Sequence, residues 1–138
     1  MARVFSREEL PRFASLRDGR ARLDLVTENV PVGARELRAD RIVYGPGDTS
    51  AVHYHVGCVH VFYVLRGEGV AHVEDERLAL SAGDVLTVEA GEVHWFENPG
   101  AGEFAFVEFW APPPVDTVWT QQGDACTWRP LAAAEVRT

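Results

Sequence analysis

Short runs of apolar residues, separated by turn residues, make up most of the chain from residue 35 onward. They are rich in β-branched and aromatic side chains, and turn signals recur about every 8 to 12 residues. The pattern predicts strands at 35–44, 60–65, 70–73, 77–80, 85–88, 93–96 and 104–110. No amphipathic helix of about ten residues separates these runs, so a parallel βαβ fold is disfavoured. We expect an all-β sandwich or barrel.

The segments on either side of these strands have a different character. Ser6 and Glu9 fit a helix capping box, and Pro11 limits the helix that can follow to a short one. Three prolines at 112–114 form a stiff connector to a C-terminal tail. The apolar residues of this tail could fold it back over the barrel. We expect an N-terminal extension at 1–34, a barrel at 35–112 and a tail at 113–138.

Charge and cysteine content exclude several classes of protein. The 138 residues carry 21 acids and 13 bases, a net charge of −8, which argues against a nucleic-acid partner. No apolar run is long enough for a membrane span, and the first residues lack the apolar region of a secretory signal. Two cysteines, Cys58 and Cys126, make no disulfide framework, so a cytoplasmic location is expected.

The bases, all arginine, are unevenly distributed. Residues 1–41 carry nine Arg and seven acids, a net of +2, whereas residues 42–138 carry four Arg and 14 acids, a net of −10. The basic N-terminal segment is expected either to lie against an acidic body, its own or a partner's, or to be a solvated leader.

Four of the five histidines follow a pattern typical of metal ligands. His53 and His55 lie two residues apart, so on a strand both imidazoles face the same side, about 7 Å apart. His60 follows His55 at an odd offset. The chain between these two therefore has to bend or bulge, and Gly57 suits that bend. His94 is remote in sequence and would reach the site from a neighbouring strand of a closed barrel.

Two motifs contain these histidines. The first has the spacing G-x5-H-x-H-x4-H-x6-G, and its members are Gly47, His53, His55, His60 and Gly67. The second has the spacing G-x5-E-x-G-x2-H-x3-N, and its members are Gly83, Glu89, Gly91, His94 and Asn98. In order and spacing, residues 35–112 resemble the cupins, whose motifs have Glu where this chain has His60 and Pro where it has Glu89. The resemblance implies a double-stranded β-helix, a jelly-roll barrel.

The replacement at position 60 changes the metal site that the resemblance implies. Where many cupins have three His and one Glu, this chain would have four His ligands: His53, His55, His60 and His94. Imidazole ligands suit one divalent transition metal per chain, which we expect to be Fe first, then Zn, Ni, Mn or Cu. Four neutral ligands leave the charge of the metal uncompensated, which favours an anionic, chelating substrate.

Three functions are consistent with such a site. The first is a metal-dependent enzyme, a dioxygenase, that acts on a small anionic or enolisable organic substrate. The second is a redox-neutral Zn or Ni cyclase or isomerase, because some polyketide cyclases of the cupin type have His-rich sites. The third is a non-catalytic, metal-stabilised cupin that only binds a small molecule.

Strand parity predicts what surrounds the metal. Phe62 and Val64 share the parity of His60, and Phe96 shares that of His94, so these three side chains would form an apolar substrate pocket. Tyr63 and Leu65 point the other way and are also large. This apolar outer face suggests cover by a second subunit, and the resemblance likewise implies a homodimer.

Three other residues carry open alternatives. Glu108 interrupts an apolar strand, and it lies either at an exposed end or beside a histidine N–H, with a possible catalytic role. Cys58, in the bend between His55 and His60, is expected to be a small buried apolar group rather than a ligand. His72 lies outside both motifs and is expected at the surface.

Overall fold

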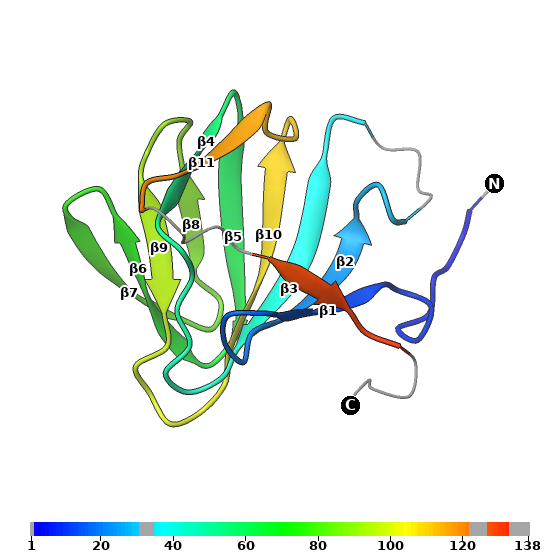
Figure 1. Ribbon diagram of the computed structural model, residues 1–138, viewed down its shortest axis with the longest axis horizontal. Coiled ribbons are helices and arrows are strands. Elements are labelled where there is room, and N and C mark those ends of the chain that lie inside the picture. Colours follow the sequence, from blue (N-terminus) through cyan, green and yellow to red (C-terminus); the bar gives the residue numbers. More distant parts are fainter. Residues whose placement is uncertain (1, 31–34, 122–126, 133–138) are drawn as a thin grey trace.

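Two antiparallel β-sheets face each other in the computed structural model of the chain (Figure 1). The structure describes residues 2–30, 35–121 and 127–132. This part of the chain contains no helix and the following strands: β1 (Arg12–Ser15), β2 (Ala21–Val26), β3 (Arg38–Tyr44), β4 (His53–Val56), β5 (Val59–Arg66), β6 (Glu68–Val73), β7 (Glu76–Ser81), β8 (Val85–Val88), β9 (His94–Glu97), β10 (Phe104–Ala111), β11 (Asp116–Trp119) and β12 (Trp128–Pro130).

The order of the strands gives the fold its jelly-roll character. The larger sheet has the order β12-β1-β2-β3-β10-β5-β8, and the smaller has the order β11-β4-β9-β6-β7. Strands consecutive in sequence therefore often lie in opposite sheets, as in a double-stranded β-helix. The predicted all-β barrel is confirmed.

The predicted strands appear with small shifts at their ends. β3 begins at Arg38 rather than at residue 35 because Arg38 pairs with Trp110, the last residue of β10 that lies opposite β3. The predicted short N-terminal helix is absent. Instead Ser6 and Glu9 form a single turn, in which the Ser6 backbone N–H donates to the Glu9 carboxylate at 2.7 Å. One half of the capping box is thus present without a helix behind it.

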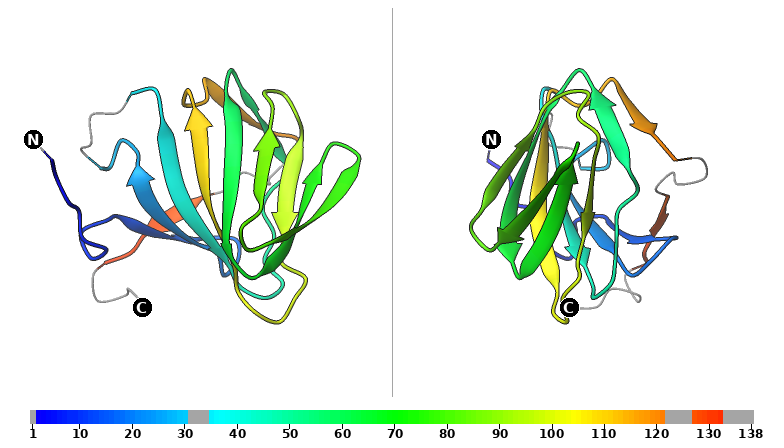
Figure 2. Two further views of the ribbon diagram at one scale, coloured as in Figure 1. Left: turned by 180° about the vertical axis from the view of Figure 1, so that it is seen from behind. Right: turned by 90° about the vertical axis from the view of Figure 1, so that its left-hand side faces the viewer.

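Both flanking segments add strands to the sheets (Figure 2). β1 and β2 of the N-terminal segment continue the larger sheet beyond β3, and β12 of the tail pairs with β1. β11 pairs with β4 in the smaller sheet. The tail therefore folds back on the barrel, as expected. Cys126 lies outside the described residues.

The hydrophobic core fills the space between the two sheets. Alternation along β3 and β5 directs every second side chain inward, and the centre is an aromatic cluster. The buried core residues are Ile42, Tyr44, Phe62, Val64, Ala71, Val73, Leu80, Val88, Phe96, Phe104 and Phe106.

The bend expected between His55 and His60 is present at Gly57. This glycine has φ 75°, a conformation that other residues rarely adopt, and it separates β4 from β5. Because of this bend His55 and His60 can both point into the barrel, even though they lie an odd number of residues apart. Within the described residues we find no helical segment of the length and apolar character that a membrane span requires.

Candidate metal centre

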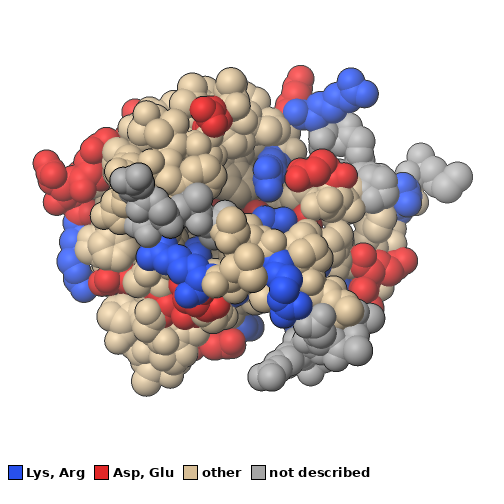
Figure 3. Space-filling model, in the orientation of Figure 1, with Lys and Arg blue, Asp and Glu red and all other residues tan. Residues whose placement is uncertain are grey.

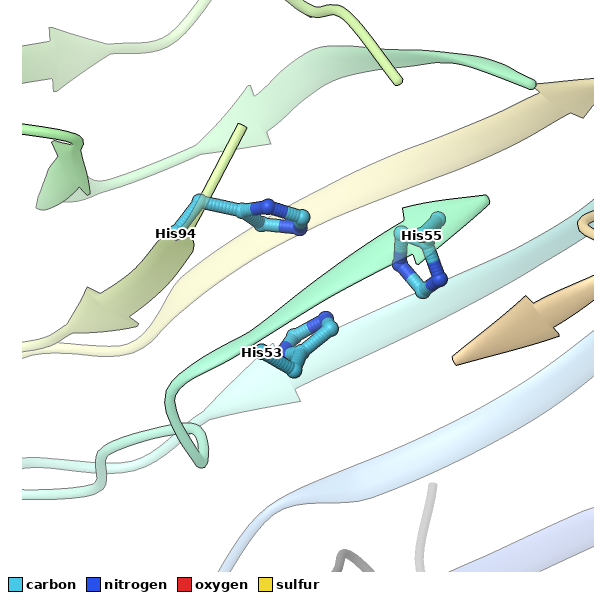
Figure 4. Close-up of side chains that lie close together, drawn as sticks. All are labelled: His53, His55 and His94. Carbon is cyan, nitrogen blue, oxygen red and sulfur yellow. The ribbon is translucent and has the colours of Figure 1, made fainter. Parts of the chain in front are cut away.

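Three histidines converge at one end of the barrel, and their positions follow from strand pairing. His53 on β4 lies directly opposite His94 on β9. His55 lies two residues further along β4 and faces the same way. Figure 4 shows the three imidazoles pointing toward one another. Each offers one ligand nitrogen, and these nitrogens all lie within 4.8 Å of one another.

Each of these rings is oriented through its Nδ1 atom. The Nδ1 of His53 lies 2.7 Å from a backbone carbonyl two residues earlier, and that of His94 lies 2.9 Å from the corresponding carbonyl. The Nδ1 of His55 lies 2.8 Å from the Oγ1 of Thr117 in β11. A proton on Nδ1 leaves the Nε2 lone pair free to bind a metal. The Nε2 atoms of His55 and His94 are buried and lack a hydrogen-bond partner among the described residues. This fits the free lone pair that a metal ligand must offer.

The environment of the cluster keeps the imidazoles neutral. Burial, followed by the neighbouring histidines, lowers the pKa of His55 to about 2. Burial and the charge of His53 lower the pKa of His94 to about 3. Burial also lowers the pKa of His53. Since only a neutral imidazole can bind a metal, the donor set fits a divalent transition ion at neutral pH.

His60 lies in the same cluster but is oriented differently. Its ring centre is 4.9 Å from that of His55, yet neither of its nitrogens belongs to the converging set. The ring is packed between Phe62, at 4.0 Å, and Trp110, at 4.4 Å. Its Nε2 lies 3.1 Å from a carboxylate oxygen of Glu108. The structure therefore brings four histidines together, as expected, but aims three of them at a common point.

Glu108 belongs to a buried pair of carboxyl groups. It lies opposite Asp40 in the β10–β3 ladder, and a side-chain hydrogen bond joins the two. Burial, and then the charge of Glu108, raise the pKa of Asp40 well above its ordinary value. Burial also raises the pKa of Glu108. Burial and the proximity of the two carboxyl groups thus favour a protonated form of the pair beside His60.

A cavity of about 260 Å³ adjoins the histidine cluster. The aromatic rings of Trp110, Trp119 and Trp128 form part of its wall, so both tail strands contribute to it. Arg20, Arg22 and Arg38 line the same cavity. In Figure 3 a hollow opens on this face of the molecule, with basic side chains at its border.

The three arginines differ in their partners. Arg20 pairs with Asp18 at 2.9 Å, and Arg22 pairs with the buried Asp24 at 2.8 Å. Arg38 lies over the ring of Trp110, and its Nε is buried without a hydrogen-bond partner among the described residues. Its charge partly opposes the rise that burial causes in the pKa of Asp40 and Glu108, and its buried Nε remains a donor for an anion inside the cavity.

The structure places the other predicted residues as follows. Phe62 and Phe96 line the cavity, whereas Val64 is buried in the core and is not part of its lining. Tyr63 and Leu65 face outward, each 44% exposed. Cys58 is buried and forms no disulfide with any cysteine of the described residues. His72 lies half-buried near the surface, stacked on Trp95 at 3.9 Å.

Sequence reasoning missed three residues of the site: Thr117, Arg38 and Asp40. The last two could have been found, because residues 38, 40, 42 and 44 alternate along one strand and the second pair is apolar. Polar residues that continue an inward-facing series belong to the interior. Thr117 carries no such signal, since only the pairing of β11 with β4 places it beside His55.

Comparisons with known proteins agree with this architecture. The family model of the cupin domain matches residues 40–110. The chain is 30% identical over 99 residues to the oxalate-binding protein of Thermotoga maritima, which is 70% of this chain and 81% of that protein. A solved structure from Thermotoga maritima, described as a predicted oxalate decarboxylase, is 26% identical. It has a TM-score of 0.70 and covers 80% of this chain and 100% of its own.

A further structure extends the likeness to the flanking strands. The polyketide cyclase RemF from Streptomyces resistomycificus superposes with a TM-score of 0.74 over 90% of this chain and 89% of its own. At 17% identity this likeness concerns the fold alone. The family model spans residues 40–110, which include every histidine of the cluster. This chain belongs to the cupin family.

Proposed function

We propose that this cupin is a metal-dependent enzyme that acts on a small organic anion. His53, His55 and His94 would hold one divalent transition metal, Fe first and then Zn, Ni, Mn or Cu, with His60 beside them. When bound, such a metal supplies Lewis-acid or redox chemistry toward an oxygen-bearing ligand. The observation that carries the proposal is the convergence of three histidine nitrogens, two of them buried and unpartnered among the described residues, in a cavity that Arg38 also lines.

The residues around the cluster would select and orient the substrate. Arg38 would bind a carboxylate or enolate oxygen through two parallel N–H groups. Trp110, Phe62 and Phe96 would exclude water from one side of the substrate and pack against its carbon skeleton. A cavity of about 260 Å³ limits the substrate to a small molecule.

Oxidation by O2 is the reaction we propose first, since iron is among the metals that imidazole ligands suit and it supports redox chemistry. The test is metal analysis of protein purified without a tag or chelator, followed by O2 uptake after anaerobic Fe(II) loading. A panel of β-dicarbonyls, phenols and small dicarboxylates serves as substrates. Substrate-dependent O2 uptake that His94→Ala abolishes would support a dioxygenase. Folded protein that binds neither Fe nor Zn would refute the metal site itself.

One observation favours a second reaction class, a redox-neutral cyclisation or isomerisation. Asp40 and Glu108 line the cavity, and burial raises the pKa of both, which suits the pair to donate a proton to a substrate. Such an enzyme would work without O2 and would be active with Zn. Anaerobic turnover by the Zn form, lost in Glu108→Gln, distinguishes this reaction from dioxygenation.

A third function, binding without turnover, is favoured by the name of one relative, an oxalate-binding protein. Oxalate carries two carboxylates, which would match the proposed metal on one side and the buried Nε of Arg38 on the other. Calorimetric titration of the metal-loaded protein with oxalate tests this function. Tight binding together with no conversion of any panel substrate would replace the enzyme proposal.

We also propose that the protein is a homodimer. Tyr63 and Leu65 are exposed on the outer face of β5, and Val85 at the edge strand β8 is 61% exposed. Burial of such apolar side chains against a second copy would stabilise association. Sedimentation of the wild type against Tyr63→Ser tests this proposal, and a monomeric wild type would overturn it.

A further inference from the structure

A second hollow, distinct from the metal cavity, lies on the outer face of the larger sheet. Inward and outward side chains alternate along β3, so Arg41 and Val43 face away from the core that contains Ile42 and Tyr44. Cross-strand pairing places Leu23 beside Arg41 and Arg12 beside Leu23. Figure 2, left, views this side of β3 and its neighbours. The resulting groove has a volume of about 920 Å³.

Basic side chains border this groove. They come from the N-terminal turn, from four different strands of the sheet and from both ends of the chain: Arg7, Arg12, Arg41, Arg66 and Arg129. Two acids also line the groove, but each has a basic partner. Glu103 pairs with Arg66 at 2.9 Å, and Asp18 pairs with Arg20 at 2.9 Å. Arg7, Arg12 and Arg41 belong to the basic segment 1–41, so the groove gathers positive charge in a chain whose net charge is −8.

Two of these arginines have a buried donor atom without a partner. The Nε atoms of Arg12 and Arg41 are buried, and neither has a hydrogen-bond partner among the described residues. Arg12 donates to the backbone carbonyl of Arg7 at 3.2 Å, which holds two cationic residues close together. Burial and the charges of Arg7, Arg66 and Arg12 lower the pKa of Arg41, and Glu103 only partly opposes them. The fold therefore holds several like charges together with Glu103 as a partial counter-charge.

We propose that this groove binds an organic phosphate, a small molecule that carries two or more phosphate groups. The guanidinium group presents paired N–H donors that match phosphate oxygens, and several such groups around one groove suit several phosphates. The floor consists of Leu23, Val43 and Leu131, which offer apolar surface to the organic part of the ligand. The lining of the groove includes no histidine, and it shares only Arg20 and Arg22 with the cavity beside the histidine cluster.

The experiment is calorimetric titration with inorganic tripolyphosphate in about 0.15 M NaCl, which screens weak surface attraction. The wild type should bind with a stoichiometry near one per chain. Arg41→Gln and Arg12→Gln should each weaken binding at least about tenfold, since each removes a charge-assisted donor pair. The control is Arg77→Gln, which changes the net charge equally but lies on the distant β6–β7 hairpin, and it should leave the affinity unchanged.

Variants at exposed positions guard against misfolding. Arg7→Gln and Arg66→Gln, on the rim, should weaken binding about two- to fivefold without affecting the fold. In ligand-free protein Arg41→Gln should not lower the thermal midpoint, because it relieves repulsion. Vesicles that carry a bisphosphorylated lipid distinguish a headgroup from a free phosphate ligand. Binding only to such vesicles, and not to tripolyphosphate, would overturn a soluble ligand.

Three further results would overturn the site. The first is that tripolyphosphate shows no saturable binding, and the second is that Arg77→Gln loses as much affinity as Arg41→Gln. The third is that a single-stranded RNA binds as tightly as tripolyphosphate, which would indicate a non-selective basic patch. His94→Ala should bind tripolyphosphate like the wild type, so failure of the metal site and failure of this site can be told apart.

Discussion

The Nδ1 of His55 lies 2.8 Å from the Oγ1 of Thr117, a residue 62 positions later in the chain. Thr117 also lies directly opposite His55 in the β4–β11 ladder. The hydroxyl oxygen can accept a hydrogen bond from Nδ1–H and so direct Nε2 toward the other two histidines. The C-terminal tail therefore takes part in building the metal site and does not merely cover it.

We predict that Thr117→Val lowers metal affinity about 10- to 100-fold, because the isosteric change removes the group that orients His55. Competition with a chromogenic chelator measures the loss. Thr120→Val is the matched control, since its hydroxyl only reaches a backbone carbonyl at 3.4 Å on the surface. Equal affinities of Thr117→Val and the wild type would show that the tail does not orient the ligand.

His94 and His60 should differ in their effect on the metal. His94→Ala removes one of the three converging nitrogens and should lower affinity by at least about 100-fold, which metal analysis after dialysis would reveal. His60→Gln can still donate to Glu108, so it should retain most of the metal. Loss of metal in both variants to the same extent would restore the four-histidine ligand set that the sequence suggests.

This difference shows where sequence reasoning reaches its limit. The spacing of His53, His55 and His94 predicts convergence because strand parity and a turn are local properties. The orientation of His60 depends on Glu108, 48 residues away, and on packing between two aromatic rings. No local pattern contains that information.

The same division holds for the fold. Alternation and turn residues predict the central strands, and their ends move only where a pairing partner stops, as at Arg38. β11 and β12 have no strong pattern of their own, and each forms because it pairs with an existing edge strand. Ser6 and Glu9 do form a hydrogen bond of the predicted capping box, but no helix follows them among the described residues.

Glu108→Gln tests the role of the carboxyl pair. An amide can accept from His60 and donate to Asp40, so the packing and hydrogen bonds should persist while the shared proton disappears. We expect unchanged metal content and a fall in turnover of at least about tenfold. Glu76→Gln, at the tip of an exposed hairpin, is the control for a lost carboxylate. Normal turnover in Glu108→Gln would show that the pair is only structural.

The histidine cluster should make the metal-free protein sensitive to acid. In the unfolded chain a histidine has a pKa of about 6.5, whereas the folded values for His55 and His94 are about 2 and 3. Below pH 6.5 these two histidines therefore bind protons in the unfolded state but stay neutral in the native state, so stability falls as pH falls. As the pH falls from about 7 to 5.5, these two residues should lower the free energy of unfolding by about 2 to 3 kcal/mol.

The carboxyl pair acts in the opposite direction. Its raised pKa means that the native state keeps a proton that the unfolded state loses above about pH 4, so its contribution is lost as pH rises. The raised pKa of the carboxyl pair offsets only part of the change in stability that the lowered pKa values of the histidines cause. Urea unfolding of chelator-treated protein from about pH 5.5 to 7 should thus show stability rising with pH. A flat or falling curve would mean that the imidazoles are charged in the native state.

Arg38 should determine the affinity for anionic substrates without affecting the metal. Arg38→Gln keeps a polar side chain over Trp110 but removes the positive charge from the cavity. Loss of a charge-assisted, two-point contact should weaken binding of a small dicarboxylate about 10- to 100-fold, or 1.5 to 3 kcal/mol. The control is Arg35→Gln, at an exposed position three residues before Arg38. It changes the net charge equally, and this variant should bind the dicarboxylate like the wild type. Calorimetry on the metal-loaded proteins compares the two. If both variants lose affinity alike, the long-range field of the protein and not a guanidinium contact attracts the anion, and the effect should then vanish at high salt.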